Sequence, residues 1–345
     1  MRALDRAGRR TNLALLAVLA AAVGSGVLAF AVGSPSAVRA VVVVHGVAGV
    51  CVALLAPWKT VIARRGLRRA RPTGRRIASV ALAAVVVVVV VTGVAHAMGA
   101  AGPYLGITSM QVHVGGAVAA AVLVLEHAVR YRVRPRRTDL SRRTAVRAGT
   151  LAGGGLLLWG GIEATAPLAS LPGMERRATG SHERGTDRPT EMPVTQWFSD
   201  VVPGLDPARF RLEVRGDATA YVDIGDLGEE DVVRALLDCT GGWFAEQDWS
   251  GIRLDRLLSA TAGLPLRGRS IDVVSVTGYR RRFPLDDAGR LLLATHLGGR
   301  PLSAGHGAPV RLVAPDRRGF WWVKWVSRVE VVDTPWWLQS PFPLQ

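Results

Sequence analysis

The chain has 345 residues, of which 49% are hydrophobic, and a formal net charge of +16 at pH 7. Such an excess of Lys and Arg would suit a nucleic-acid-binding protein, but it lies in three connectors within residues 1–10, 59–76 and 130–147. Each connector adjoins long apolar runs, as do the basic cytoplasmic loops of membrane proteins. The charge distribution therefore argues against nucleic-acid binding and indicates contact with a lipid bilayer.

The N-terminal half contains five apolar stretches long enough to cross a bilayer, which takes about 20 residues each. They lie at 11–33, 39–57, 78–99, 110–129 and 148–168. Because basic connectors stay inside, we expect a cytoplasmic N-terminus, and five spans then place the rest of the chain outside the bacterial cell membrane. Residues 1–169 are predicted to form an all-α five-helix transmembrane bundle.

The fifth stretch begins with Ser-Arg-Arg-Thr-Ala-Val-Arg, from Ser141 to Arg147. This pattern resembles a twin-arginine signal, which exports folded proteins across the bacterial membrane. Alternatively, Arg142 and Arg143 only anchor the cytoplasmic end of a helix. The sequence leaves both interpretations open.

Four of the seven histidines, His45, His96, His113 and His127, lie in or beside the apolar stretches. Ionisable side chains within a bilayer are costly and usually functional. The first three lie near the outer ends of their spans, and glycines flank His45 and His113, which lets a flat macrocycle approach the backbone. We therefore predict a b-type haem, with His45 and His113 as the preferred axial ligands of the iron.

His96 is the substitute ligand in this hypothesis. His113 and His127 are 14 residues apart, so they share one helix face about 21 Å apart along the axis. His127 is thus either a ligand of a second haem or a residue at the inner boundary of the membrane. The alternative is a structural bundle without haem. Cys51 is interpreted as an inert small hydrophobe.

Residues 170–192 are rich in Pro, Gly, Ser, Thr and charged residues and are predicted to be a linker to a soluble domain at 193–345. The sequence pattern predicts strands and helices in this domain. Strands are expected at Phe210–Val214, Ile271–Val276, Val310–Ala314 and Val326–Val332, and helices at Glu229–Leu237 and Leu254–Ala260. Such a mixture indicates an α+β fold with an antiparallel or mixed sheet.

Cys239 is the single cysteine of the soluble half and lies in Leu-Asp-Cys-Thr-Gly-Gly-Trp. A thiol that has no partner for a disulfide and adjoins a glycine turn suggests a metal ligand or a nucleophile. A lone buried cysteine is also often structural. The residues around it decide between these interpretations.

Several motifs downstream resemble the molybdopterin-binding domain of the sulfite oxidase family, which includes the periplasmic methionine sulfoxide reductase catalytic subunit. The resemblance covers roughly residues 190–335. It rests on the cysteine loop at 237–242, Trp-Ser-Gly-Ile-Arg-Leu at 249–254, Tyr-Arg-Arg-Arg-Phe-Pro-Leu at 279–285, His-Gly-Ala-Pro-Val-Arg at 306–311 and Gly-Phe-Trp-Trp-Val-Lys-Trp at 319–325.

The resemblance implies a sulfite-oxidase-type α+β fold and a role for each matched residue. Cys239 would ligate molybdenum as a soft thiolate, and Tyr279 would face the metal or the substrate. Thr240, His306, Arg311 and Lys324 would bind the molybdopterin, since fixed cations suit its phosphate. The remaining cations beside Tyr279, which are Arg280, Arg281 and Arg282, are interpreted as solvated surface, with positive charge near the pocket as the alternative.

The second, immunoglobulin-like domain of sulfite oxidases has no counterpart in these 345 residues. Because that domain supplies part of the sulfite pocket, the substrate class stays open among small oxyanions, sulfoxides and N-oxides.

The two halves together predict a membrane-anchored molybdopterin-dependent oxidoreductase. Oxygen-atom transfer would occur at the Cys-ligated molybdenum, and electrons would be exchanged with the quinone pool through the haem. The direction of electron flow is open. The alternatives are a molybdopterin-fold protein without haem that uses a separate electron carrier, and a non-catalytic binding module.

Overall fold

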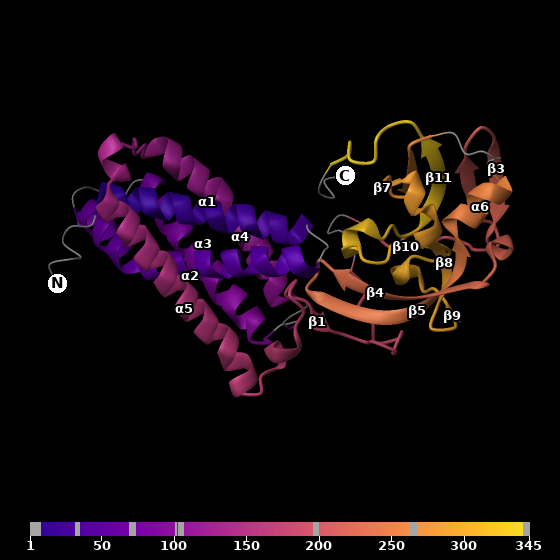
Figure 1. Ribbon diagram of the computed structural model, residues 1–345, viewed down its shortest axis with the longest axis horizontal. Helices are drawn as coiled ribbons and strands as arrows, with labels where there is room; N and C mark the ends of the chain where they lie inside the picture. The colour runs from indigo at the N-terminus through magenta and orange to yellow at the C-terminus, as the bar shows by residue number, and fades with distance from the viewer. Residues whose placement is uncertain are drawn as a thin grey trace. The chain divides into compact units, whose positions relative to one another are not determined.

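The computed structural model describes residues 8–31, 35–68, 74–100, 102, 107–195, 200–261 and 268–340. Parts of the first predicted span and of the first two basic connectors lie outside these residues. The chain divides into two compact units, Met1–His182 and Glu183–Gln345. Figure 1 shows long helices in the first unit and mainly strands in the second.

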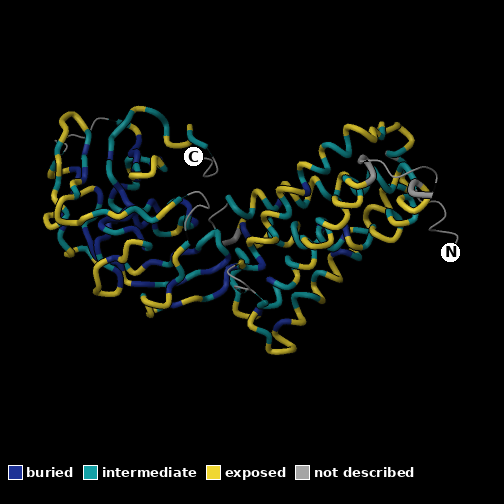
Figure 2. Tube along the Cα trace, turned by 180° about the vertical axis from the view of Figure 1, so that it is seen from behind, coloured by how far each residue is buried: buried dark blue, intermediate teal, exposed yellow. Residues whose placement is uncertain are grey.

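The first unit, called the helical unit below, has five long helices among its described residues. They are α1 (Arg9–Ala31), α2 (Pro35–Arg68), α3 (Gly74–Ala97), α4 (Ser109–Arg130) and α5 (Arg142–Leu168), with short 3₁₀ turns at Arg137–Leu140 and Pro172–Glu175. Runs of Ala, Val and Leu form them, and many of these side chains are exposed. Figure 2 shows few buried positions along these helices. A surface of this kind suits a lipid environment.

Four of these helices, α1 to α4, are long and apolar enough to cross a membrane. The fifth helix does not reach the same hydropathy, so four of the five predicted membrane spans are supported. The reason is composition, because glycines, threonines and Glu163 dilute the leucines of α5. Membrane association is nevertheless indicated by the other four helices.

Helix α5 packs closely on α2 despite its lower hydropathy. A Cβ added to Gly155 would lie 2.6 Å from the Sγ of Cys51, and one added to Gly46 would lie 2.8 Å from the ring of Trp159. The thiol of Cys51 donates to the carbonyl of Leu151 at 3.5 Å. Small residues let the two backbones approach, as they do between membrane helices.

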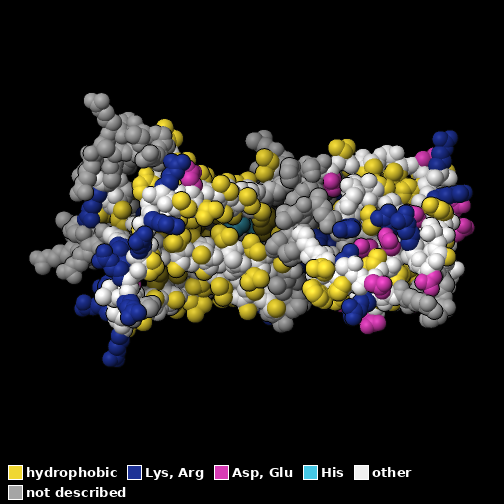
Figure 3. Space-filling view, turned by 90° about the horizontal axis from the view of Figure 1, so that it is seen from above, with side chains coloured by type: hydrophobic (Ala, Val, Ile, Leu, Met, Phe, Trp, Pro, Cys, Tyr) yellow, Lys and Arg dark blue, Asp and Glu magenta, His cyan; other side chains and the backbone are white. Residues whose placement is uncertain are grey.

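The two ends of the helical unit differ in charge. At one end, Arg9 forms an ion pair with Asp139, which joins the start of α1 to the connector after α4. At the other end, Arg176 pairs with Glu163 and donates to the carbonyl of Ala97 at 2.9 Å. Figure 3 shows Lys and Arg gathered at the first end and apolar side chains along the helices.

The second unit, called the C-terminal unit below, contains two sheets among its described residues. The six-stranded sheet consists of β1 (His182–Glu183, at the boundary of the units), β4 (Asp231–Cys239), β5 (Trp243–Arg253), β8 (Leu292–Leu297), β9 (Arg300–Pro301) and β10 (Arg311–Val313). The five-stranded sheet has the order β3-β2-β11-β6-β7 and consists of β2 (Arg211–Arg215), β3 (Thr219–Asp223), β6 (Ser270–Ser275), β7 (Arg280–Pro284) and β11 (Val326–Val332). One helix, α6 (Leu254–Thr261), and several 3₁₀ turns join them.

The predicted α+β class and the four predicted strands are confirmed, and the second sheet is mixed because β11 runs parallel to β2. The helix predicted at Glu229–Leu237 is wrong. Most of that segment belongs to β4, whose residues pair with β5 along its whole length. Its spacing of apolar residues suits a helix, but the pairing with β5 decides the local structure.

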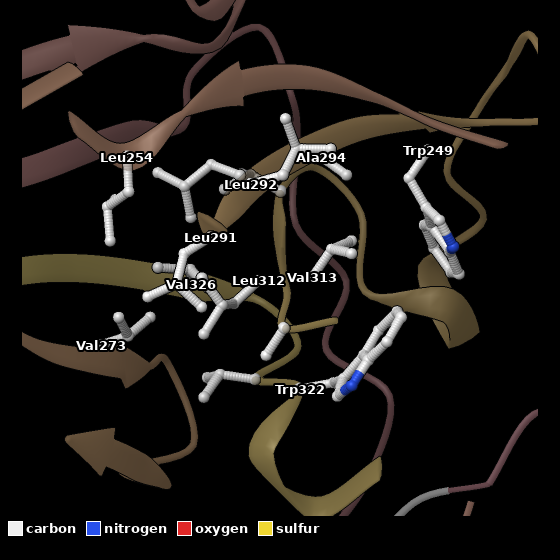
Figure 4. Packing of buried hydrophobic residues seen from close by; sticks show 14 of the residues in the cluster. Trp249, Leu254, Val273, Leu291, Leu292, Ala294, Leu312, Val313, Trp322 and Val326 are labelled. Carbon is white, nitrogen blue, oxygen red and sulfur yellow. The ribbon is translucent and has the colours of Figure 1, made fainter. Parts of the chain in front are cut away.

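A single hydrophobic cluster fills the space between the sheets. Figure 4 shows Trp249 and Trp322 at one side of it and the aliphatic side chains of β8, β10 and β11 at the other. The two tryptophan rings lie edge to face, with centres 5.5 Å apart. A Cβ at Gly251 would lie 2.0 Å from the carbonyl oxygen of Leu293, so only glycine fits at this position, where β5 pairs with β8.

Candidate functional site

The residues that the sequence predicted for catalysis and for binding of the pterin all line one cavity of the C-terminal unit. The cavity has a volume of about 140 Å³. The six residues are Cys239, Thr240, Tyr279, His306, Arg311 and Lys324. Cys239 and Thr240 lie at the end of β4, and Tyr279 lies in the turn before β7. Arg311 is the first residue of β10, His306 precedes this strand and Lys324 follows it.

Cys239 is the last residue of β4, and its Sγ accepts a hydrogen bond from the backbone N–H of Gly241 at 3.3 Å. Burial raises the pKa of the Cys239 thiol, while that N–H and the cations Arg318 and Lys324 act to lower it. Gly319 lies against the cysteine, since a Cβ there would be 3.0 Å from the Cα of Cys239. The thiol is thus held on a fixed backbone and faces the cavity.

Arg311 is 2% exposed and stands between the rings of Trp249 and Trp322, with its guanidinium carbon 4.8 Å and 5.6 Å from their centres. Its Nη1 donates to the carbonyl of His306 at 2.9 Å, and its Nε has no partner. Burial lowers the pKa of Arg311 to about 10. In the described part of the chain, no carboxylate pairs with this cation.

Lys324 is the second cation of the cavity and is partly buried. Its Nζ donates to the carbonyls of Thr195 at 2.8 Å and Gly305 at 2.6 Å. Burial, and then the charge of Arg311, lower the pKa of Lys324 to about 7. Neither cation forms an ion pair with a carboxylate of the described residues, so the two favour the binding of an anion, which would restore the proton of the lysine.

His306 supports this arrangement and does not contribute a charge. Its Nδ1 is 2.9 Å from the hydroxyl of Ser303, and its Nε2 is 3.1 Å from the carbonyl of Met192. Burial first, and then Arg311, lower the pKa of His306 to about 4, so the ring is neutral at pH 7. Its carbonyl holds Arg311 in place, so its clearest role is structural support of the cation.

Tyr279 lies at the turn before β7, and its hydroxyl group has two protein partners. The hydroxyl donates to the carbonyl of Phe320 and accepts from the Nε of Arg281 at 2.8 Å. Burial raises the pKa of Tyr279, while the charge of Arg281 acts to lower it. The phenol is therefore protonated and fixed at the edge of the cavity.

The interpretation of Arg281 and Arg282 as solvated surface is wrong. Arg281 is fully buried, and Arg282 is 8% exposed and forms a bidentate ion pair with Asp272 at 2.6 and 2.8 Å. Arg280 alone among the three is exposed. Strand alternation around Phe283 could have signalled burial of Arg281, but three consecutive arginines suggested a solvated run.

Asp200 also lines the cavity and was missed because nothing in its sequence context distinguishes it. Its negative charge acts to raise the pKa of both Tyr279 and Lys324, so it lies close to both side chains. Among the described residues, it is the one carboxylate in the cavity wall. It gives the cavity a group that can exchange protons with a bound molecule.

The helical unit contains a second candidate site, formed by His45 of α2 and His113 of α4. The centres of the two imidazole rings are 5.8 Å apart. The Nδ1 of His45 lies 2.9 Å from the carbonyl of Ala22, and the Nδ1 of His113 lies 2.8 Å from the carbonyl of Val89. Each ring therefore donates from Nδ1, and neither Nε2 has a hydrogen-bond partner among the described residues.

The other two histidines differ from this pair. Both ring nitrogens of His96 have partners, because Nδ1 is 3.3 Å from the hydroxyl of Ser109 and Nε2 is 2.7 Å from the carbonyl of Gly180. His127 lies near the opposite end of α4, where its Nδ1 is 3.4 Å from the hydroxyl of Ser79. The structure thus brings His45 and His113 together, whereas the ring nitrogens of His96 and the Nδ1 of His127 are engaged by other residues.

Comparison with known proteins places the C-terminal unit in a family context. Residues 199–339 match the family model described as the oxidoreductase molybdopterin binding domain. Mitochondrial sulfite oxidase of Rattus norvegicus is 31% identical over 166 residues, which cover 38% of this chain and 30% of the rat protein.

A second relative is the protein-methionine-sulfoxide reductase catalytic subunit MsrP of Xanthomonas axonopodis pv. citri. It is 30% identical over 125 residues, which cover 32% of this chain and 38% of the relative. Among solved structures, sulfane dehydrogenase SoxCD from Paracoccus pantotrophus is 24% identical with a TM-score of 0.36, over 39% of this chain and 40% of that one. The matched part of the chain thus spans about a third of each curated relative.

Proposed function

We propose that this chain, whose C-terminal unit is a molybdopterin-binding domain of the oxidoreductase class, is a membrane-anchored molybdenum enzyme that transfers an oxygen atom to or from a small substrate. The enzyme class is supported by the family match and by both relatives. The single observation that carries the proposal is the cavity in which the Cys239 thiol faces Arg311 and Lys324, two cations without an acid partner.

The residues of the cavity fit the cofactor. A thiolate is a suitable ligand for molybdenum, and the phosphate of the pterin would satisfy the unpaired Nε of Arg311 and restore the charge of Lys324. Thr240 adds a hydroxyl group beside the cysteine. When bound, the cofactor supplies two-electron redox chemistry for oxygen-atom transfer.

The other residues of the cavity would act on the substrate. The hydroxyl of Tyr279 can turn from the carbonyl of Phe320 and donate to an oxygen of the substrate. Asp200 can give or accept the protons that balance transfer of an oxygen atom. Trp243, Phe320 and Trp322 line the same cavity and exclude water from it.

We propose that the substrate is a small oxyanion, a sulfoxide or an N-oxide. Sulfite and methionine sulfoxide are the first compounds to test, because the names of the two relatives refer to them. Two cations, Arg311 and Lys324, stand against one carboxylate in the described cavity wall, which favours an anionic or strongly dipolar substrate.

We also propose that His45 and His113 hold a b-type haem that connects the enzyme to the quinone pool. The two imidazoles would hold the haem iron, so their separation bears on the proposal, and the haem would exchange electrons with quinone. The observed separation is 5.8 Å, and each Nδ1 donates to a carbonyl, which leaves Nε2 for the metal.

The surroundings of this pair suit a haem as well. A Cβ at Gly93 would lie 2.9 Å from the ring of His113, and one at Gly26 would lie 3.1 Å from the ring of His45, so glycines leave room for both imidazoles. Beside Gly49, one turn after His45, a Cβ would meet nothing within 4 Å. The described residues contain no cluster of three or more metal-binding side chains, and a haem needs only two.

For the membrane topology, we propose that α5 crosses the bilayer with the four apolar helices. It begins beside Asp139 at the basic end and reaches Glu163 at the opposite end, and it packs on α2. The N-terminus would then be cytoplasmic and the C-terminal unit outside the bacterial cell. Arg142 and Arg143 at the start of α5 would act as cytoplasmic anchors or as a twin-arginine signal. An impermeant thiol reagent should label Asp217→Cys in intact cells, and labelling only after lysis would reverse this orientation.

The direct test of the enzyme is to measure molybdenum and pterin in the purified full-length protein and then to assay it with methionine sulfoxide and sulfite. Cys239→Ser should lose turnover because the thiolate ligand is replaced by a poorer one, whereas Cys51→Ser should keep it. Turnover of Cys239→Ser at the wild-type rate would contradict the assignment of the metal ligand.

The electron-transfer part has its own test. Membranes that contain the protein should show the optical spectrum of a b-type haem, which quinol should reduce. Molybdenum without any haem would instead support the alternative of a separate electron carrier. A cavity that binds neither molybdenum nor pterin would support a non-catalytic binding module.

A further inference from the structure

Arg281 is a fully buried cation that contacts the candidate catalytic tyrosine from outside the cavity. Its guanidinium carbon lies 5.3 Å from the ring centre of Tyr279, 5.0 Å from that of Phe320 and 5.5 Å from that of Trp321. Its Nη1 donates to the carbonyl of Ser340 at 2.7 Å, and its Nη2 has no partner. In the described part of the chain, it forms no ion pair.

The C-terminal segment that Arg281 contacts, residues 338–340, is held along the edge strand β7. The side chain of Gln339 forms hydrogen bonds to both backbone groups of Arg282, accepting from its N–H at 3.0 Å and donating to its carbonyl at 2.8 Å. The Nη1 of Arg282 donates to the carbonyl of Leu338 at 3.0 Å. The segment therefore covers a strand that would otherwise have an open edge.

A continuous set of hydrogen bonds leads from this segment to the cavity. Arg281 donates from Nη1 to Ser340 and from Nε to the hydroxyl oxygen of Tyr279 at 2.8 Å. The hydroxyl of Tyr279 then donates to the carbonyl of Phe320. Phe320 follows Gly319, which lies against the backbone of Cys239, so the set ends beside the candidate metal ligand.

We propose that Arg281 is a positioning residue that uses the C-terminal segment as a fixed support to orient the hydroxyl of Tyr279 toward the reacting groups. This inference rests on the proposed function. When the hydroxyl oxygen of Tyr279 accepts a hydrogen bond from Arg281, one of its lone pairs is occupied. The hydroxyl proton then points either to the carbonyl of Phe320 or into the cavity. Without Arg281, the phenol could rotate and donate in other directions.

The charge of Arg281 gives this role a measurable signature. The charged groups that act on Tyr279 are Arg281, which lowers the pKa of the phenol, and Asp200, which raises it. Removal of Arg281 should therefore raise the pKa of Tyr279 further. A purely structural arginine would change stability without moving this pKa.

The test uses the full-length protein with its cofactor. Arg281→Gln should lower kcat on the order of tenfold to a hundredfold, with KM and molybdenum content near wild-type values. Arg281→Lys should restore part of kcat, because it keeps the charge with a single donor group. The control is Arg280→Gln, which removes an exposed cation of the same strand. Methionine sulfoxide with a reduced viologen dye, and sulfite with ferricyanide, serve as assay pairs.

A second measurement does not depend on turnover. Fluorotyrosine placed at position 279 should titrate at a higher pH in Arg281→Gln than in the parent protein, as read by fluorine NMR. Gln339→Ala, which loosens the C-terminal segment, should change kcat in the same direction by a smaller factor. If Arg281→Gln folds poorly, Gln339→Ala and Arg281→Lys carry the test.

Unchanged kcat and an unchanged titration of Tyr279 in Arg281→Gln would overturn the positioning role. Failure of the proposed function itself would look different, since the parent protein would then lack molybdenum or turnover. Equal effects of Arg281→Gln in the parent and in Tyr279→Phe would also overturn the proposal, because the arginine would then act independently of the phenol.

Discussion

Two groups of buried cations in the C-terminal unit have opposite surroundings. Arg282 pairs with Asp272, and Arg318 pairs with Asp238 at 2.6 Å, with all four residues less than 9% exposed. Arg311, by contrast, is just as deeply buried among aromatic rings and has no carboxylate. A buried charge without a counter-charge is expensive, so the protein tolerates it where a ligand supplies the missing charge.

The histidines of the helical unit show the same contrast. His96 has a protein partner at both ring nitrogens, whereas His45 and His113 each keep one nitrogen without a partner among the described residues. Side chains with complete sets of partners serve the fold. Side chains that line a cavity or face each other and keep an unused group are candidates for binding. The following predictions test this distinction.

The largest effect is expected at the histidine pair. On the proposed assignment, His113→Ala should remove all b-type haem absorbance, since one of the two proposed ligands is lost. His96→Ala is the matched control and should keep the haem, because its ring is already engaged by Ser109 and Gly180. Loss of haem in His96→Ala together with its retention in His113→Ala would reverse the assignment.

The second largest effect is expected at Arg318, a buried cation that has a carboxylate partner. Arg318→Gln should lower the free energy of unfolding of the C-terminal unit by about 3–5 kcal/mol, because it leaves Asp238 buried without its partner. Thermal unfolding of the cofactor-free protein would measure this loss. A thermal midpoint equal to that of the parent protein would contradict the structural role of this pair.

An unpaired cation should give the opposite result. Arg311→Gln should weaken binding of the cofactor by about 1.5–3 kcal/mol, the value of a charge-assisted hydrogen bond. The cofactor-free protein should be no less stable than the parent, since a buried charge without a carboxylate is removed. Molybdenum and pterin content, with thermal midpoints, would show whether binding and stability separate in this way.

The sequence predicted more of the sites than of their surroundings. Cys239, Arg311 and Lys324 could be placed in one cavity because ordered motifs resemble a known family. The burial of Arg281 was missed, since three consecutive arginines suggested a solvated run and the carbonyl that it contacts lies 59 residues later in the chain. The helix expected at Glu229–Leu237 failed for a similar reason, because pairing with β5 is not encoded in the local pattern.

The membrane half shows the same limit. The sequence predicted five helices and preferred His45 and His113 as the pair of ligands, and the centres of these two rings lie 5.8 Å apart in the structure. It could not show that His96 would be engaged by Gly180, a residue 84 positions later. Partners that are distant in sequence decide which histidine keeps a free nitrogen.

The smallest effect, at most about 1.4 kcal/mol for each pH unit, concerns pH. The pKa of Lys324 is about 7 in the folded protein against 10.5 for an unperturbed lysine. Between these values the unfolded chain binds one more proton than the folded chain, so the stability of the cofactor-free protein should rise as pH increases from about 7 to about 10. Thermal midpoints of the cofactor-free protein across this range would measure the rise.

Binding of the cofactor should show the reverse dependence on pH. An anion beside Lys324 raises the pKa of the lysine, so binding takes up a proton, and affinity should fall as pH increases above 7, by at most about tenfold per pH unit. Lys324→Met should remove the part of both trends that this lysine causes, while Lys59→Met should leave both trends unchanged. An affinity that stays constant from pH 7 to pH 9 in the parent protein would show that Lys324 keeps its proton without the ligand. Lys324 would then belong with the cations that have a partner in the protein.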